Sequence, residues 1–326
     1  METPVFRLGL VGFNEREEQL LRAGAAAYRQ VDWRCGRAEG ADAWVIKGAR
    51  IARIQDNRLR VIASEGTSTG AAFLLDAGSR PVAIATPAPQ QVAQLVPLFF
   101  DPAQDGALAG ALATLDSQLD RLRRQYWAAS LLVEHNATVG KALYELRTFD
   151  QVLAVADMKG AVHIAPQATG EQFDHAVWRH RARKSVEVLP DFERHSLAEL
   201  LWAYATRTRR DLLPARYKDY SVHLRRPPRV PAELVGDVHL RIVRELAVGP
   251  ASMASLAEKI GVDDKTLSRA MAALYLVGSV TTNPERAWSS SEQGSLWSTR
   301  SGAFNTAALQ SPGPDTDGMP STAPLM

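Results

Sequence analysis

The pattern of hydrophobic and polar positions in the first hundred residues alternates between strand-like and helix-like stretches. An apolar spacing near 3.6 residues predicts helices over 15–29, with Asn14 as N-cap, and over 90–99. Short apolar runs predict strands over 5–11, 31–34, 41–46, 58–63 and 81–86. Strands that alternate with helices indicate an α/β domain over 1–104, with a parallel sheet covered on both faces.

One long helix is predicted next, because apolar residues recur at steps of four and three from 106 to 135. This apolar stripe consists of Leu108, Leu112, Leu115, Leu119, Leu122, Tyr126, Ala129, Leu132 and Val133. One interpretation is a coiled-coil linker over 105–136 that makes the chain a homodimer. The other is a helix that packs on its own domain, and the spacing favours neither.

The middle segment, 137–232, is expected to form a small α/β domain. Its predicted elements are a hairpin of strands 152–156 and 161–165, helices 172–181 and 197–206, and strands 186–189 and 221–224. Ser196 is the expected N-cap of the second helix. A helix over 172–181 would place His175 and Arg179 on one face, where they could bind a phosphate. An ordinary exposed basic helix accounts for both residues more simply.

Between 233 and 288 the pattern predicts three helices and a short strand. Gly249 and Pro250 end the first helix, and Ser252 and Gly261 bound the second. Asp264 is the expected N-cap of a third helix over 265–276, and a β-prone run follows over 279–282. The tail over 289–326 is rich in Ser, Thr, Gly and Pro, which is typical of disorder.

The phrase SLAEKIGVDDKTLSRAMAALYLVGSV within the third of these segments resembles the winged helix-turn-helix domains of bacterial transcription regulators. The resemblance implies double-stranded DNA as partner, with the start of the third helix in the groove and Arg286 beside the wing. Together with the basic run before the domain, the expected DNA-binding residues are Lys265, Thr266, Ser268, Arg269, Arg286, Arg225, Arg226 and Arg229.

Charge keeps a second interpretation open for this domain. From 236 to 288 there are six basic and six acidic residues, whereas DNA-binding domains are usually basic. The basic surface lies earlier, with 13 Lys and Arg against 6 Asp and Glu from 179 to 229. The domain could therefore take phosphate contacts from the preceding segment, or it could bind a protein instead.

The strand and helix order of residues 5–100, with the run SRPVAIATP, resembles the receiver domain of two-component response regulators, which has a flavodoxin-like fold. Receivers hold a divalent cation with acidic residues after the first strand and phosphorylate an Asp after the third. Here those places hold Gly12, Phe13 and Asn14, and Lys47. The resemblance therefore implies a pseudo-receiver that takes no phosphoryl group. An unrelated flavodoxin-like or Rossmann-like domain remains the alternative.

Composition narrows the function classes further. Cys35 is the only cysteine, so the chain can form no internal disulfide, which suits a reducing compartment and a cytoplasmic protein. No signal peptide and no membrane-spanning segment is expected. No cofactor, metal site or catalytic constellation stands out. The sequence thus predicts a DNA-binding signalling or transcription regulator that is not an enzyme, with a protein-interaction scaffold or signalling adaptor as the alternative.

Overall fold

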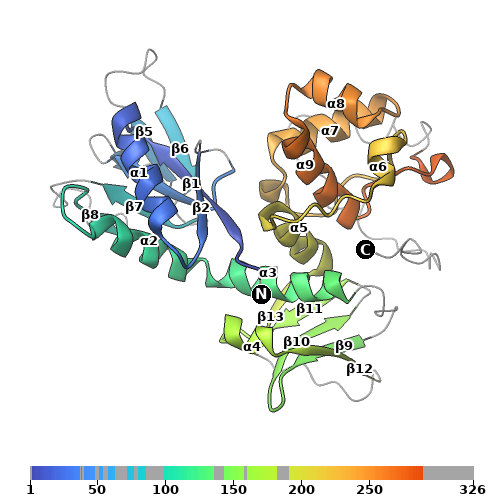
Figure 1. Cartoon of the computed structure of the whole chain (residues 1–326), viewed down its shortest axis with the longest axis horizontal. Helices are drawn as coiled ribbons and strands as arrows, with labels where there is room; N and C mark the ends of the chain where they lie inside the picture. The colour runs from blue at the N-terminus through green and yellow to red at the C-terminus, as the bar shows by residue number, and fades with distance from the viewer. Residues whose placement is uncertain are drawn as a thin grey trace. The chain divides into compact units, whose positions relative to one another are not determined.

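The computed structural model divides the chain into two compact units (Figure 1). The first comprises Met1–Trp127 with Arg207–Arg209, and the second comprises Ala128–Thr206 and the chain from Arg210 onward. The structure describes residues 2–36, 38, 40–47, 51–53, 58–62, 72–76, 80–85, 98–135, 143–157, 160–181 and 191–288. The predicted strand over 186–189, most of the predicted helix over 90–99, and the tail over 289–326 lie outside the described residues.

The first unit contains the predicted parallel α/β sheet. Its five strands lie in the order β2 (Asp32–Gly36), β1 (Val5–Val11), β3 (Ala43–Lys47), β7 (Val82–Ala85) and β8 (Phe99–Phe100). All four pairings are parallel. Residue 99 therefore lies in a strand and not at the end of a helix.

Between β3 and β7 of the parallel sheet, the chain forms a separate antiparallel sheet of three strands. It consists of β4 (Ile51–Arg53), β5 (Arg58–Ile62) and β6 (Ala72–Asp76). The prediction that the 58–63 strand joins the parallel sheet is wrong. The reason is the short connection from β4, since a parallel pair needs a crossover of about a dozen residues.

Two helices pack on the same face of the parallel sheet. Helix α1 (Glu15–Ala27) begins with the predicted Asn14 cap, whose Oδ1 accepts from the amide of Glu17 at 2.9 Å. Helix α2 (Ala107–Gln118) buries Leu112 and Leu115 completely, in the core that also contains Phe6. The side chains of the proposed coiled-coil seam in α2 are therefore occupied within their own domain.

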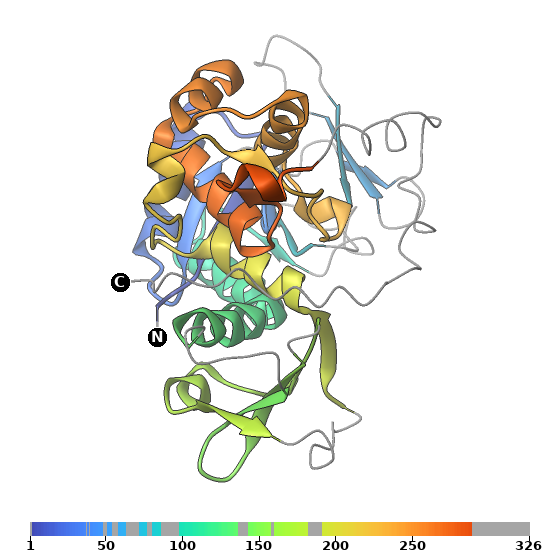
Figure 2. The same cartoon turned by 90° about the vertical axis from the view of Figure 1, so that its right-hand side faces the viewer.

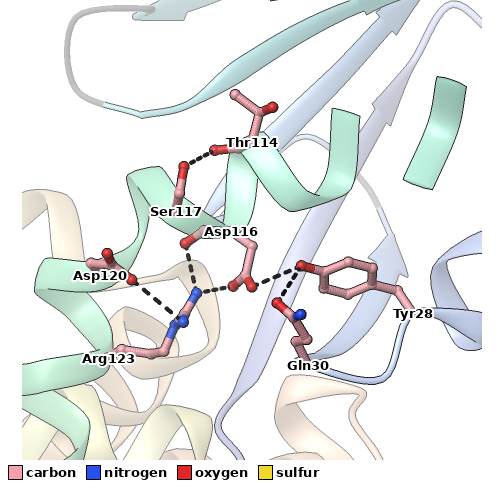
Figure 3. Close-up of polar contacts among 7 residues, drawn as sticks. All are labelled: Tyr28, Gln30, Thr114, Asp116, Ser117, Asp120 and Arg123. Carbon is pink, nitrogen blue, oxygen red and sulfur yellow. Dashed lines mark hydrogen bonds and ion pairs between the residues drawn. The ribbon is translucent and has the colours of Figure 1, made fainter. Parts of the chain in front are cut away.

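The single helix predicted over 106–135 is two helices, α2 and α3 (Asp120–Glu134), separated at Leu119. A buried polar cluster holds this break (Figure 3). Arg123 donates to the carbonyl oxygen of Asp116 at 2.8 Å and also pairs with its carboxylate. The hydroxyl of Tyr28, which follows α1, donates to the same carboxylate at 2.9 Å. Burial raises the pKa of Asp116, and Arg123 opposes the rise.

The second unit begins with an antiparallel five-stranded sheet along which the second half of α3 lies (Figures 1 and 2). Its order is β12 (Val177–Arg181), β9 (Leu143–Arg147), β10 (Val152–Asp157), β11 (Ala161–Ile164) and β13 (Glu193–Ser196). The predicted hairpin is confirmed as β10 and β11. Gly160, in the turn, has φ +141°.

The helix predicted over 172–181 is wrong. A short helix, α4 (Gly170–Asp174), ends early in this range, and the chain continues as β12 on the edge of the sheet. Trp178 is buried in this strand beside β9, so burial of the aromatic side chain outweighs the helical spacing. His175 and Arg179 therefore do not share a helix face.

The rest of the unit is mostly helical. Helix α5 (Leu197–Arg207) has the predicted Ser196 cap, and α6 (Arg216–Asp219) is a single turn. They are followed by β14 (His223–Leu224), α7 (Asp237–Val248), α8 (Met253–Ile260), α9 (Asp264–Leu276) and β15 (Val280–Thr281). Trp202 of α5 joins them by donating from Nε1 to the carbonyl of Leu234 at 3.0 Å.

The predicted boundaries of the last three helices hold with one exception. Ser252 caps α8, and Gly261 ends it in the left-handed conformation at φ +72°. The cap of α9 is Asp263 and not Asp264, because the Oδ1 of Asp263 accepts from the amide of Thr266 at 2.9 Å. No helix in the described part of the chain has the length and apolar character needed to cross a membrane.

Candidate nucleic-acid interface

The exposed part of α9 is limited to its first turn. Lys265 and Thr266 are exposed there, next to Asp263 and Asp264. Further along, the helix is buried on several sides. The buried side chains are Leu267, Ala270, Met271, Ala272, Ala273 and Leu274. The surface that α9 can present to a groove is therefore its N-terminal turn.

The next two predicted contact residues of α9 are half-buried. The hydroxyl of Ser268 donates to Oδ1 of Asp211 at 3.2 Å. Near the other end of the helix, the ring of Tyr275 packs edge-on against that of Tyr217, with centroids 5.2 Å apart. The segment from Asp211 to Tyr217 thus contacts the side of α9 on which Ser268 lies. Arg269, the residue after Ser268, is also only partly exposed.

Thr266 is part of the helix cap. Its amide donates to Oδ1 of Asp263, and its hydroxyl donates to Oδ2 of the same residue at 2.7 Å. These hydrogen bonds lower the pKa of Asp263, so this carboxylate stays charged at neutral pH. Lys265 is the exposed cation of this turn, and the carboxylates of Asp263 and Asp264 lie next to it in sequence.

A second cationic site lies at the opposite end of α9, around the β14–β15 pair. Strand β14 pairs antiparallel with β15, and Arg225 follows directly after it. The hydroxyl of Tyr217, in α6, donates to the carbonyl of Val280 at 3.1 Å. These contacts bring α6, β15 and the 3₁₀ helix Pro284–Arg286 around one cavity of about 190 Å³. It is lined by Arg216, Tyr217, Arg225, Tyr275, Gly278, Val280, Thr281, Thr282, Asn283 and Arg286.

Arg226 contributes to the structure next to this cavity. Its Nη2 donates to the carbonyl of Val277, the C-cap residue of α9, at 3.1 Å. A cation in this place stabilises the negative end of the helix dipole. Burial lowers the pKa of Arg226, and the neighbouring charges of Arg229 and Arg225 lower it further.

The arginines in this region share one electrostatic property. Within residues 191–288 no carboxylate lies within ion-pair distance of any of them. The group consists of Arg216, Arg225, Arg226, Arg229 and Arg286, which we call the arginine cluster. Several other cations in the same stretch are paired with a carboxylate, as Lys218 is with Asp211 at 2.8 Å. The arginine cluster therefore presents uncompensated positive charge.

Four members of the arginine cluster were predicted from the sequence, and Arg216 was not singled out as a contact. It belongs to the basic segment 179–229, which was the available signal. Its place beside the cavity depends on the packing of α6 against α9, and no local pattern encodes that packing. The two tyrosines of the cavity were missed for the same reason.

The carboxyl ends of the parallel strands in the first unit are the usual ligand site of an open α/β sheet. Here Lys47, at the end of β3, places Nζ 2.6 Å from Oε1 of Glu17 in α1. The pKa of Glu17 is lowered, mainly because its carboxylate accepts a hydrogen bond from Lys47. Lys47 is thus engaged in an internal ion pair at this edge.

The described residues contain no group of three or more His, Cys, Asp and Glu side chains placed to hold a metal ion. His180, in β12, instead packs edge-on against Tyr144, with ring centroids 5.6 Å apart. Comparison of the chain with protein-family models, with curated proteins and with solved structures gives no match.

Proposed function

We propose that the chain is a signalling or transcription regulator that binds double-stranded DNA through its C-terminal segment. The observation that carries the proposal is the arginine cluster, in which Arg216, Arg225 and Arg286 converge on one cavity without a carboxylate partner within 191–288. Duplex DNA is a polyanion, and neutralising its phosphates supplies most of the affinity of DNA-binding proteins. The order of α7, α8, α9 and β15 is that of a winged helix-turn-helix.

The two cationic sites are suitably spaced for one duplex. Lys265 lies at the start of α9 and Tyr275 near its end, so about 15 Å of helix separates them. The major groove is about 12 Å wide. In this proposal Lys265 contacts the phosphates on one side of the groove, and Arg225 and Arg286 contact those on the other.

Sequence preference would come from few residues. Thr266 is exposed but engaged with Asp263, and Ser268 is engaged with Asp211. Arg269, half-buried in the first half of α9, is the base reader that the sequence predicts. The proposal therefore expects binding that depends strongly on salt and weakly on sequence.

For the first unit we propose a pseudo-receiver. Its strand order β2–β1–β3–β7–β8 corresponds to the 2-1-3-4-5 order of flavodoxin-like sheets. The ion pair of Lys47 with Glu17 occupies the edge where a receiver would hold its cation. Incubation with acetyl phosphate and Mg²⁺ is expected to leave the intact mass unchanged, and a stoichiometric phosphoryl adduct would contradict this proposal. The single cysteine suits the reducing cytoplasm, which we propose as the location.

The DNA proposal is tested by fluorescence anisotropy with a random-sequence duplex over a range of salt concentrations. Arg225→Ala and Arg286→Ala should each weaken binding to all sequences and lower the salt slope by about one. Arg244→Ala is the matched control, because Arg244 is exposed on α7 and does not line the cavity. Wild-type protein that fails to bind even at low salt would contradict DNA binding.

A protein partner is the second candidate, and the buried face of α9 favours it. Because the 211–217 segment contacts the side of α9 that includes Ser268, that side of the helix is partly covered and offers less surface to a DNA groove. A scaffold or adaptor would use the same arginine cluster to bind an acidic peptide. Loss of such a partner in Arg286→Ala, without any duplex binding by the wild type, would support this second function.

A further inference from the structure

The cavity beside the arginine cluster is small, and three of its lining residues are arginines. Its volume, about 190 Å³, is below the roughly 300 Å³ at which typical pockets for drug-sized ligands begin. A space of this size can accommodate a phosphoryl group and a few water molecules but not a large organic ligand. Its size therefore selects a compact anion or one end of a larger molecule.

Some of the other polar side chains that line the cavity are already engaged in hydrogen bonds, so the arginines are the main groups that can bind an anion. The hydroxyl of Tyr217 is engaged with the carbonyl of Val280. Oδ1 of Asn283 accepts from the amide of Glu285 at 2.9 Å, so its side-chain NH₂ is the part left to donate. Arg216 has a buried Nε with no hydrogen-bond partner among the described residues. Guanidinium groups match phosphate oxygens in geometry as well as charge.

We propose that this cavity is an effector site for the terminal phosphoryl group of a small phosphate monoester. A monoester has three free oxygens and carries close to two negative charges at neutral pH, since its second pKa is about 6. Three arginines around one small cavity suit such a dianion. A phosphodiester within a duplex carries one charge and must continue on both sides, so it can contact the rim of the cavity without filling it.

The regulatory consequence rests on the proposed DNA binding. Arg225 and Arg286 belong both to the cavity and to the surface proposed for the duplex. A phosphate monoester that neutralises them removes two of the phosphate contacts available to DNA. The monoester and the duplex should therefore compete, and the affinity of each should fall when the other is present.

The direct test is a ³¹P NMR titration of methyl phosphate with the full chain, without DNA. Methyl phosphate should bind, and its affinity should rise between pH 5 and pH 7.5 as the dianion forms at about pH 6. Dimethyl phosphate, a diester with one charge, should bind at least about tenfold more weakly. Equal binding of the two esters, or no pH dependence, would overturn the assignment to a monoester.

Two variants test whether methyl phosphate binds in this cavity. Arg286→Gln should raise the Kd for methyl phosphate by about tenfold or more, and Arg244→Gln should not change it. Arg286 is exposed on a single 3₁₀ turn, so its loss should leave the fold intact. As a second variant, Thr282→Glu places a carboxylate in the lining and should abolish binding. Unchanged binding in both variants would show that phosphate binds elsewhere.

A final arm separates this proposal from the DNA proposal. Methyl phosphate should release a bound fluorescent duplex, at a concentration that follows its own Kd. If methyl phosphate binds and the wild type binds no duplex, the phosphate site stands, and the DNA function fails together with its regulation by the monoester. If the duplex binds but methyl phosphate does not, the effector site is overturned and DNA binding is unaffected.

Discussion

Nη2 of Arg226 donates to the carbonyl oxygen of Val277 at 3.1 Å, so a residue that precedes α7 in sequence closes the C-terminal end of α9. Gly278 follows in the left-handed conformation at φ +68° and turns the chain into β15. Its amide donates to the carbonyl of Tyr275 at 2.9 Å. This junction holds β15 at one wall of the cavity. The arginines can therefore bind a ligand there only if the junction is intact.

Gly278→Ala should destabilise this junction. The left-handed conformation strains an L-residue, and the added Cβ would lie 3.1 Å from Nη2 of Arg226. We expect a cost of about 1 kcal/mol or more, measured as faster amide hydrogen exchange in α9 and β15. Gly249→Ala is the matched control, because Gly249 is extended and a Cβ there meets no atom within 4 Å. Equal effects of the two substitutions would contradict this account.

Leu115→Ala should destabilise the first unit without altering the mass of the particle. Leu115 is fully buried in the core of α1, α2 and the parallel sheet, so truncation should cost about 2–5 kcal/mol. Leu240→Ala, at a half-exposed position of α7, should cost less than about 0.5 kcal/mol. Urea unfolding measures the loss of stability, and light scattering measures the mass of the particle. Conversion of a dimer into monomers by Leu115→Ala would restore the coiled-coil interpretation.

Two tyrosines should keep their protons in strongly alkaline solution. Burial raises the pKa of Tyr28 to about 12, helped by its hydrogen bond to Asp116. Burial also raises the pKa of Tyr217 to about 12, helped by Tyr275. The unfolded chain loses these protons near pH 10, so stability should fall as the pH rises from 10 toward 12.

Tyrosinate absorbance measures this directly. In wild-type protein one part of the absorbance should appear only near pH 12 or on unfolding, and Tyr28→Phe should reduce that part. Tyr220→Phe is the control, because Tyr220 is 65% exposed. Full titration of all seven tyrosines below pH 11 would contradict the burial of these hydroxyls.

Glu17→Gln should weaken the first unit at neutral pH but not in acid. The hydrogen bond with Lys47 lowers the pKa of Glu17 in the folded chain. Its stabilisation is therefore present above the unfolded pKa of about 4.3 and is lost as the pH falls through the lower folded value. Because both side chains are about one-third exposed, we expect only about 0.5–1 kcal/mol at pH 7.

The matched control for this ion pair is Glu15→Gln, which removes the same charge from the first turn of the same helix. Hydrogen exchange in α1 and β1 at pH 7 should increase more in Glu17→Gln than in Glu15→Gln. Unfolding by urea near pH 3 should show no difference between Glu17→Gln and wild type. A difference that persists in acid would mean that the contact does not depend on the carboxylate charge.

The sequence by itself determined the elements whose signals are local. Asn14, Ser196 and Ser252 cap the helices that follow them, because a cap needs only an oxygen and an amide three residues later. Gly261 ends α8 because it adopts the left-handed conformation at little cost. The hairpin of β10 and β11 and the strands β1, β2, β3 and β7 of the parallel sheet follow equally from short-range patterns.

Only the tertiary structure decided what these elements contact. The spacing of Leu112 and Leu115 suited a coiled coil and a domain core equally, and the apolar face of the parallel sheet decided between them. The segment 177–181 became a strand because β9 offered an edge and Trp178 could be buried there. The cavity joins Arg216, Arg225 and Arg286 from three elements. Their convergence depends on long-range packing of side chains, which a periodic pattern along the chain does not record.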